Sequence, residues 1–432
     1  MLDIIDIDDI IFDDLKDDKL LRAKEAREEF NGSELIIAKD CRYSLDDFKT
    51  QLNNNVLVVG GSGTGKTRTI VTPNIHQAVG SYVISDPKGN LHKKYGKYLT
   101  KKGYRIRVID FTRPEMSDCY NPMMRVRTTQ DILKMASVLV NEKASTNTHA
   151  DPFWDSMAIM LVSAIIGYMI ETEYQPCNFS SILNLVREGD RPSEDNRHSK
   201  LQKRFAALKL IDPQSWACAQ FDSVDTSPRK TYDTIRATLA GKFARFDSKE
   251  LQEMMNGNDL DLAAIGQEKT AVFVIVSDTD RTMDSLANIF FTQAMNALCE
   301  YADNKCEDSR LPIPVRFFLD DFATNCKIEE FPRMISSIRS RGISVMLMIQ
   351  SEAQLTQGYA EDGMTIISNC DTYVYLGGND VATAEAISKR CNKPLGQVLN
   401  MPIGSCRVFR RGSQPVYSVL SDVKECIREM EL

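Results

Sequence analysis

The segment Gly60-Gly61-Ser62-Gly63-Thr64-Gly65-Lys66-Thr67 fits the pattern G-x-x-x-x-G-K-[ST] of a phosphate-binding loop. The apolar run before it, residues 55–59, predicts a buried strand, and residues 68–71 can open a helix. Glycines let backbone N–H groups curl around an anion because no Cβ is in the way, and the helix N-terminus adds the positive end of its dipole. We therefore predict that this segment cradles the phosphates of a nucleoside triphosphate.

The loop ends in an amine and a hydroxyl that suit this task. Lys66 is expected to reach the β- and γ-phosphates, and the Thr67 hydroxyl is expected to bind Mg²⁺. A dinucleotide-binding fingerprint fits less well, because its third glycine would be out of register and the two residues would have no role in it. The predicted cofactors are therefore ATP and Mg²⁺. The other predicted nucleotide-binding residues of the loop are Gly60, Gly61, Ser62, Gly63, Thr64 and Gly65.

The composition excludes several other classes of protein. A length of 432 residues suits two or three domains, and 43% hydrophobic residues suffice for a folded core. The net charge of −7 argues against a generally basic nucleic-acid coat, so DNA contacts must come from local basic segments such as residues 93–107, 197–204 and 229–245. Eleven scattered cysteines without a C-x-x-C pair, and only four histidines, indicate reduced thiols and no zinc site.

No segment is predicted to span a membrane. The most apolar stretch, Met157 to Ile170, is shorter than a bilayer requires and is flanked by Asp155 and Glu171, so we expect a buried core helix. Residues 3–18 alternate acidic and apolar side chains. They are expected to form a solvated, partly frayed terminus, or else a short element that docks on a basic partner.

Strand and helix patterns alternate on both sides of a long helical stretch. This order predicts an α/β fold with a mostly parallel central sheet. The chain is therefore divided into a leader and lead-in (1–50), a nucleotide-binding domain (51–127 and 258–432) and an inserted all-α domain (128–257). Strands are predicted at residues 81–86, 105–110, 270–276, 315–320, 343–349 and 371–376, an edge hairpin at 407–419, and helices at 286–301 and 329–341.

Polar side chains follow three of the predicted strands. Asp320 is expected to face the nucleotide and hold Mg²⁺ through water, and Asp321 to orient or deprotonate the attacking water. Gln350 is placed to touch the γ-phosphate or that water, unless it is a surface glutamine. Asp86 and Lys88 follow the second strand and are expected in the same crevice, although their spacing alone is a less specific signal.

Arg339 and Arg341 end the predicted helix 329–341. In a ring, either arginine can reach the neighbouring subunit's site and neutralise charge in the transition state. Both residues also suit a helix C-terminus, where cations complement the helix dipole. The residues alone leave the two interpretations open.

In combination, these segments resemble the TraG-type coupling proteins of type IV secretion and conjugation, especially those of Gram-positive conjugative elements. The resemblance implies a RecA-like motor domain with an inserted all-α domain, assembled as a homo-hexameric ring at the cytoplasmic face of the membrane. It implies ATP hydrolysis, DNA binding, and delivery of relaxase-bound single-stranded DNA or secreted proteins to the secretion channel. The segments that carry it are the phosphate loop, Ser85–Asn90, Asp151–Trp154, Phe318–Phe322, Ser340–Gly342, Gln350 and Val374–Asp380.

The resemblance also assigns roles to single residues. Lys66 and Thr67 match the phosphate and Mg²⁺ ligands, Asp320 matches the Walker B aspartate, and Arg339 matches the arginine finger better than Arg341.

Two departures from the family pattern carry expectations of their own. Asp321 stands where the family usually has glutamate, and a carboxylate set back by about an ångström predicts slow hydrolysis unless a water bridges the gap. Most members carry N-terminal transmembrane helices, which this sequence does not show. A trimmed chain or a separate membrane-anchor partner is therefore expected.

Two other functions stay open at this stage. One is a related, FtsK-like ring motor that moves double-stranded DNA. The other is a slowly hydrolysing, nucleotide-gated docking receptor for secreted proteins, which Asp321 favours.

Overall fold

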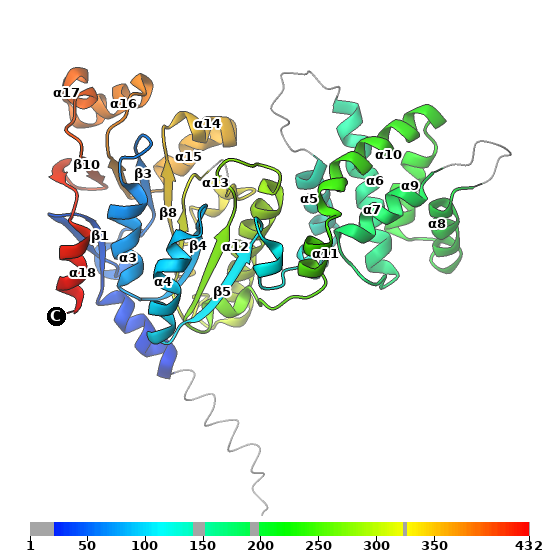
Figure 1. Ribbon diagram of the computed structural model, residues 1–432, viewed down its shortest axis with the longest axis horizontal. Coiled ribbons are helices and arrows are strands. Elements are labelled where there is room, and N and C mark those ends of the chain that lie inside the picture. Colours follow the sequence, from blue (N-terminus) through cyan, green and yellow to red (C-terminus); the bar gives the residue numbers. More distant parts are fainter. Residues whose placement is uncertain (1–20, 141–151, 191–197, 323–325, 432) are drawn as a thin grey trace, which may run out of the picture. The chain divides into compact units, whose positions relative to one another are not determined.

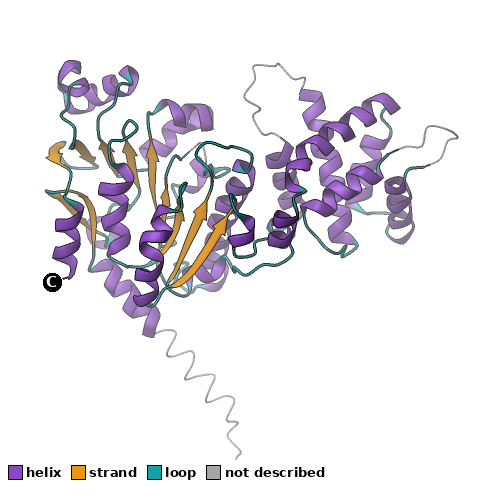
Figure 2. Cartoon of the chain, in the orientation of Figure 1, coloured by secondary structure: helices purple, strands orange, loops and turns teal. Residues whose placement is uncertain are grey.

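The computed structural model describes residues 21–140, 152–190, 198–322 and 326–431. The chain divides into two compact units, an α/β unit of residues 1–108 and 261–432 and a helical unit of residues 109–260 (Figures 1 and 2). The helical unit begins before the predicted residue 128, because the segment after residue 108 forms hydrogen bonds with the last residues of that unit. Tyr120 N donates to Met254 O (3.1 Å), and Cys119 N donates to Asp259 Oδ2 (2.8 Å). The predicted leader at residues 3–18, Asp151 and Arg197 lie outside the described residues.

A nine-stranded sheet forms the centre of the α/β unit, in the order β11-β10-β9-β3-β8-β7-β4-β6-β5. The neighbouring strands from β9 to β6 are all parallel, whereas β10 pairs antiparallel with both β9 and β11. The predicted α/β class, mostly parallel sheet and edge hairpin are thus confirmed. The strands are β3 (Val56–Val59), β4 (Ser81–Ser85), β5 (Arg105–Asp110), β6 (Thr270–Ile275), β7 (Val315–Leu319), β8 (Ile343–Ile349), β9 (Thr372–Tyr375), β10 (Ser405–Arg410) and β11 (Val416–Val419).

The central strands are buried throughout and mostly apolar, because helices cover both faces of the sheet. On one face, Ile70, Ile75 and Tyr95 join a buried core with alternate side chains of β3 and β4; α12, α13 and α15 lie behind the sheet in the view of Figure 1. The helices of this unit are α2 (Asp47–Thr50), α3 (Thr72–His76), α4 (Asn90–Lys101), α12 (Asp284–Lys305), α13 (Phe331–Met334), α14 (Ala353–Tyr359), α15 (Gly363–Ser368), α16 (Val381–Cys391), α17 (Leu395–Leu399) and α18 (Val423–Glu431), with short helical turns η1 (Lys66–Val71), η5 (Ala263–Gly266) and η6 (Ala360–Asp362).

A two-stranded antiparallel sheet, β1 (Glu34–Ala38) and β2 (Cys41–Ser44), precedes the central sheet and was not predicted. The side chain of Asn74 on α3 holds this small sheet by two hydrogen bonds to β1. Asn74 Oδ1 accepts from Ile36 N (3.2 Å), and Asn74 Nδ2 donates to Ile36 O (2.7 Å). Part of the predicted lead-in is therefore an ordered layer against α3.

The helical unit is built around α6, which packs against α5, α7, α9 and α10. Helix α6 is longer than the predicted 157–170. Its residues Phe153–Glu171 are long and apolar enough to cross a membrane by length and composition, and 56% of the most apolar window is buried within the protein. Its central side chains, among them Leu161, Val162 and Ile165, are fully buried, as in a core helix. The helices are α5 (Thr129–Val140), α6 (Pro152–Glu171), α7 (Phe179–Glu188), α8 (Lys200–Ile211), α9 (Trp216–Asp225), α10 (Arg229–Phe243) and α11 (Lys249–Met255), with turns η2 (Pro114–Met116), η3 (Pro122–Arg125) and η4 (Ala244–Phe246).

The predicted helix at residues 329–341 is mostly a succession of turns, with only Phe331–Met334 helical. Serine hydroxyls explain the difference. Ser336, Ser337 and Ser340 each donate to the carbonyl oxygen three residues earlier, at 2.9 to 3.0 Å. Such local bonds compete with regular helix hydrogen bonding, so the apolar periodicity did not decide the structure here.

Candidate nucleotide-binding site

The phosphate loop connects the end of β3 to η1 and α3, as predicted. Gly63 and Gly65 have positive φ angles of 76° and 90°, which other residues adopt only with strain. A Cβ on Gly60 would lie 2.8 Å from Thr64 Oγ1 and 2.9 Å from Leu376 Cβ. The loop therefore has a closed curvature that glycine alone permits, and this shape fits a phosphate cradle.

Lys66 lies at the mouth of this loop and is 91% buried, with a relative exposure of 9%. Its Nζ donates to the carbonyl oxygens of Gly60 (2.6 Å) and Gly61 (3.2 Å). Burial lowers the pKa of Lys66, and the charges of Asp320 and Asp321 oppose that shift. The amine is thus held close to both carboxylates, at the position from which a P-loop lysine reaches phosphate oxygens.

Thr67 and Asp320 meet across 253 residues of sequence. The Thr67 hydroxyl donates to Asp320 Oδ2 at 2.5 Å, and Asp320 directly follows β7. A hydroxyl beside a carboxylate is an oxygen donor set that fits Mg²⁺. No group of three or more His, Cys, Asp or Glu side chains in the described part of the chain could hold a metal ion. A magnesium ion bound by these two residues would therefore take its further ligands from water and phosphate oxygens.

Burial raises the pKa of Asp320, although the Thr67 hydroxyl bond opposes that shift. A carboxyl group with a raised pKa binds more protons in the folded than in the unfolded protein. Its contribution to stability is therefore present at low pH and is lost as the pH rises through the folded-state pKa. We expect Asp320→Asn to raise the melting temperature of the nucleotide-free protein at pH 7, with the gain shrinking as the medium is acidified. Thermal melts of both proteins across pH test this, and a gain that grows on acidification would contradict it.

Gln350 and Asp321 flank the Thr67–Asp320 contact. Strand β8 lies between β3 and β7, so Gln350 at its end is placed between the phosphate loop and Asp320; Gly60 N donates to Ile349 O (3.1 Å) at that point. Asp321 has a positive φ of 50°, a conformation that aspartate tolerates better than most residues. Both residues therefore follow strands that end beside the phosphate loop, but Gln350 is exposed, and the catalytic roles of both residues stay predictions.

Asp86 and Lys88 follow β4 as predicted, but the contacts of their side chains are with α4 and Asp278. Asp86 is buried, and its Oδ2 accepts from His92 N (2.8 Å) in the first turn of α4. Burial raises the Asp86 pKa despite these backbone bonds. Lys88 Nζ lies 3.2 Å from Asp278 Oδ2. The structure thus gives Asp86 a helix-capping contact and Lys88 a surface ion pair.

Arg339 and Arg341 do not contact the phosphate loop of their own chain among the described contacts. Arg339 Nη2 donates to Asp47 O (2.6 Å) and its Nε to Asp47 Oδ2 (3.4 Å). Arg341 pairs with Asp303, at 2.8 Å for both of its hydrogen bonds. The arginine-finger role, which needs a second subunit, stays a prediction.

Two further segments support the site. Gly61 N donates to the carbonyl oxygen of Gly377 (3.1 Å), so the Gly377-Gly378 turn that follows β9 contacts the phosphate loop directly. Ser85 Oγ donates to Asp320 O (3.4 Å). The sequence signal for this turn is a pair of adjacent glycines after an apolar strand, which the family resemblance includes.

Comparison with known proteins identifies the family. The model for "Type IV secretory system Conjugative DNA transfer" matches residues 12–394. Protein VirD4 of Rhizobium rhizogenes is 23% identical over 368 residues, covering 83% of this chain and 52% of that protein. The type IV secretion system-coupling protein VirD4 of Bartonella henselae is 20% identical over 374 residues, covering 84% and 57%. The chain thus spans about half the length of these curated relatives.

Solved structures show the same fold. The bacterial conjugative coupling protein TrwBdeltaN70 aligns with a TM-score of 0.65 at 15% identity, covering 92% of this chain and 91% of that one. The plasmid coupling protein TrwB in complex with ADP and Mg²⁺ gives 0.63 at 15% identity, with 92% of both chains covered. VirB4 of Thermoanaerobacter pseudethanolicus gives 0.53 at 13% identity, covering 92% and 98%. The fold is TrwB-like, consistent with the predicted RecA-like P-loop NTPase carrying a helical domain. With the family model matching most of its length, the chain belongs to the type IV secretory system conjugative DNA transfer family.

Proposed function

We propose that this chain is the ATP-hydrolysing motor part of a coupling protein, which binds DNA and delivers relaxase-bound single strands to a type IV secretion channel. The contact between Thr67 Oγ1 and Asp320 Oδ2, with Lys66 beside both carboxylates, carries the proposal. It joins a phosphate cradle to a metal-binding carboxylate on the fold of TrwB, a protein seen with the ATP analogue ADPNP and with ADP and Mg²⁺.

Each side chain has a task in this proposal. The amine of Lys66 donates to phosphate oxygens, and Thr67 with Asp320 holds Mg²⁺, which neutralises phosphate charge. Asp321 orients the attacking water, and Gln350 contacts the γ-phosphate or that water. Backbone N–H groups of residues 60–67 supply the remaining phosphate contacts.

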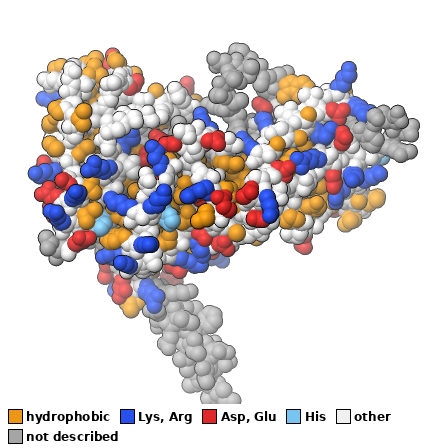
Figure 3. All heavy atoms as spheres, viewed as in Figure 1, with side chains coloured by type: hydrophobic (Ala, Val, Ile, Leu, Met, Phe, Trp, Pro, Cys, Tyr) orange, Lys and Arg blue, Asp and Glu red, His pale blue; other side chains and the backbone are white. Residues whose placement is uncertain are grey.

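The partners of the proposed motor follow from the family. We propose a homo-hexamer at the cytoplasmic face of the membrane, in which Arg339 reaches into the neighbouring site. Single-stranded DNA, a relaxase or secreted proteins are the substrates, and channel proteins or a separate membrane anchor are the partners. Local basic surfaces must contact the DNA, because Lys and Arg are interspersed with Asp and Glu over the face seen in Figure 3.

The deciding experiment measures ATP turnover with no DNA, with single strands and with duplex. Lys66→Ala supplies the background rate and should remove turnover under every condition. Stimulation by single strands supports the proposed function, whereas stimulation by duplex alone favours the FtsK-like motor.

The docking receptor is a second candidate because Asp321 carries one methylene fewer than the usual glutamate. It predicts tight ATP binding without turnover under all three conditions. Calorimetric titration with ATP and Mg²⁺ separates this outcome from a failed nucleotide site, in which binding itself would be absent.

A further inference from the structure

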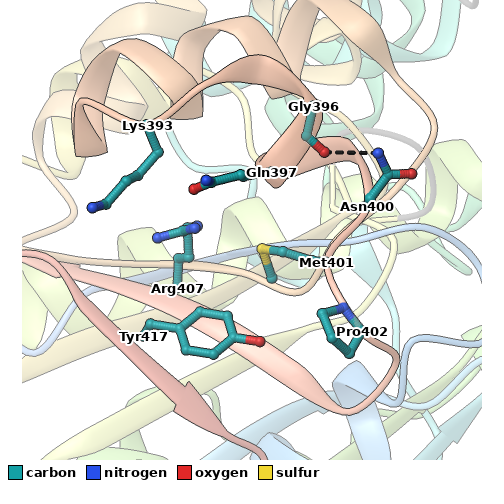
Figure 4. Close-up of a pocket in the computed structure, with 8 residues that line it drawn as sticks. All are labelled: Lys393, Gly396, Gln397, Asn400, Met401, Pro402, Arg407 and Tyr417. Atoms are coloured by element: carbon teal, nitrogen blue, oxygen red, sulfur yellow. Dashed lines mark hydrogen bonds between the residues drawn. The ribbon is translucent and has the colours of Figure 1, made fainter.

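A pocket with both polar and apolar lining residues lies at the antiparallel edge of the sheet, beside α17. Its volume is about 490 Å³, within the range of small-ligand sites. None of its eight lining residues is acidic. Figure 4 shows Arg407 rising from β10 toward Lys393 and Gln397, with the Tyr417 ring beside it. The full lining is Lys393, Gly396, Gln397, Asn400, Met401, Pro402, Arg407 and Tyr417.

Arg407 is the unusual member of this pocket. Arg407 is only 9% exposed. Its Nε is buried and has no hydrogen-bond partner among the described residues. Its guanidinium carbon lies 5.3 Å from the centre of the Tyr417 ring, and no acidic residue is recorded in an ion pair with it among those residues. A buried guanidinium is normally matched by an anion, because its desolvation is otherwise uncompensated. An anionic group is therefore the missing partner.

The rest of the lining indicates which anion. Lys393, in the connection between α16 and α17, adds a second cation, so the pocket offers positive charge from two segments of the chain, which suits a tetrahedral phosphate. Tyr417 is half exposed and presents an aromatic face, and Gln397 offers amide donors and acceptors. A phosphate joined to a planar, hydrogen-bonding ring matches all three features.

The pocket also lies near the nucleotide-binding edge without being part of the phosphate loop. Arg407 pairs with Tyr375 on β9, and Tyr375 pairs with Val59, the last residue of β3. Two strand spacings put Arg407 about 10 Å from the strand that enters the loop. Since the protein as a whole is acidic, a nucleic-acid strand needs such local cationic sites.

We propose that this pocket binds one nucleotide unit of single-stranded DNA, with the phosphate on Arg407 and Lys393 and the base against Tyr417. The identity of the ligand rests on the DNA-handling function proposed above. The pocket and its guanidinium without an anionic partner are observed independently of that function. A free nucleotide offers the same chemistry as a strand, so the test must distinguish the two.

The test is the anisotropy of a fluorescent oligo(dT) with the full chain, without ATP, from about 50 to about 200 mM salt. Arg407→Met and Lys393→Gln should each weaken binding about tenfold and reduce the slope of log K against log salt by about 0.7, the value for one phosphate contact on a single strand. Tyr417→Leu should weaken binding severalfold and leave that slope unchanged, because stacking releases no counterion. Lys424→Gln, an exposed lysine on α18, is the matched control and should bind as wild type.

Competition identifies the source of the nucleotide. If oligo(dT) displaces the probe far better than dTMP or ATP at equal nucleotide concentration, the pocket takes a strand. If ATP displaces it equally well in Lys66→Ala, the pocket takes a free nucleotide, and the strand assignment is overturned. Unchanged affinity and slope in both Arg407→Met and Lys393→Gln overturn the site itself. Melting temperatures of the variants exclude misfolding. Since no step requires hydrolysis, an absent ATPase activity would defeat the motor proposal and leave this one standing.

Discussion

Replacing Arg339 by alanine is expected to lower ATP turnover of the assembled protein by about a thousandfold, the low end for an arginine finger. The reason is the loss of a cation that neutralises charge developing on the transferred phosphoryl group. Arg341→Ala is the matched control, because Arg341 is held by Asp303 and the resemblance does not favour it as the finger. Steady-state turnover at concentrations that support the ring measures both variants.

Two further variants make the Arg339 result specific. Asp47→Asn weakens the ion pairs of Asp47 with Arg339 and Arg310 but leaves both arginines in place, so equal losses in Asp47→Asn and Arg339→Ala would indicate a structural role. Mixing Arg339→Ala with Lys66→Ala should restore part of the activity. In mixed rings, an intact finger of one subunit then meets an intact phosphate loop of the next. No recovery on mixing would contradict action between subunits.

Lengthening the carboxylate at position 321 is expected to have the second largest effect. Asp321→Glu should raise turnover by up to about a hundredfold, because a misplacement of about an ångström costs that much in an active site. The same change should cost about 1 kcal/mol of stability, since residue 321 has a positive φ of 50° and glutamate tolerates this conformation less well than aspartate. Turnover and melting temperature are therefore measured on the same samples.

Asp321→Asn is the control for the charge. It keeps the side-chain length and the tolerance for positive φ, so turnover should fall while the melting temperature stays nearly unchanged. If Asp321→Glu is no faster than wild type, the length of this carboxylate does not limit the rate, and the docking receptor loses the observation that favours it.

The sequence predicted those parts of the molecule that depend on local patterns. Short apolar runs between helical segments located the strands of the central sheet, and the glycine pattern located the phosphate loop. The end of an apolar strand placed Asp320 correctly, because parallel strands bring their carboxyl ends to one edge. The observed contact with Thr67 follows from that rule and not from the spacing of the two residues along the chain.

The parts that escaped prediction depend on competing hydrogen bonds. Asp86 accepts hydrogen bonds from backbone N–H groups in the first turn of α4, which the sequence did not predict, and its role at the nucleotide stays a prediction. Hydrogen bonds of three serine hydroxyls compete with the helix that was expected at residues 329–341. The Arg407 pocket has no sequence signature, because Lys393 comes from the segment between α16 and α17 and Arg407 comes from β10. Only the folded chain brings these two cations together.

The pairing of β3 determines when this site can form during synthesis. Its two neighbours, β8 and β9, are both encoded after the helical unit, so the strand before the phosphate loop waits for about 280 residues before its first partner emerges. At usual rates of translation that delay lasts tens of seconds. During this delay, the four apolar residues of β3 have unpaired backbone groups, and another exposed strand can pair with them. The nascent chain therefore has a window for misassembly that a molecular chaperone is suited to close.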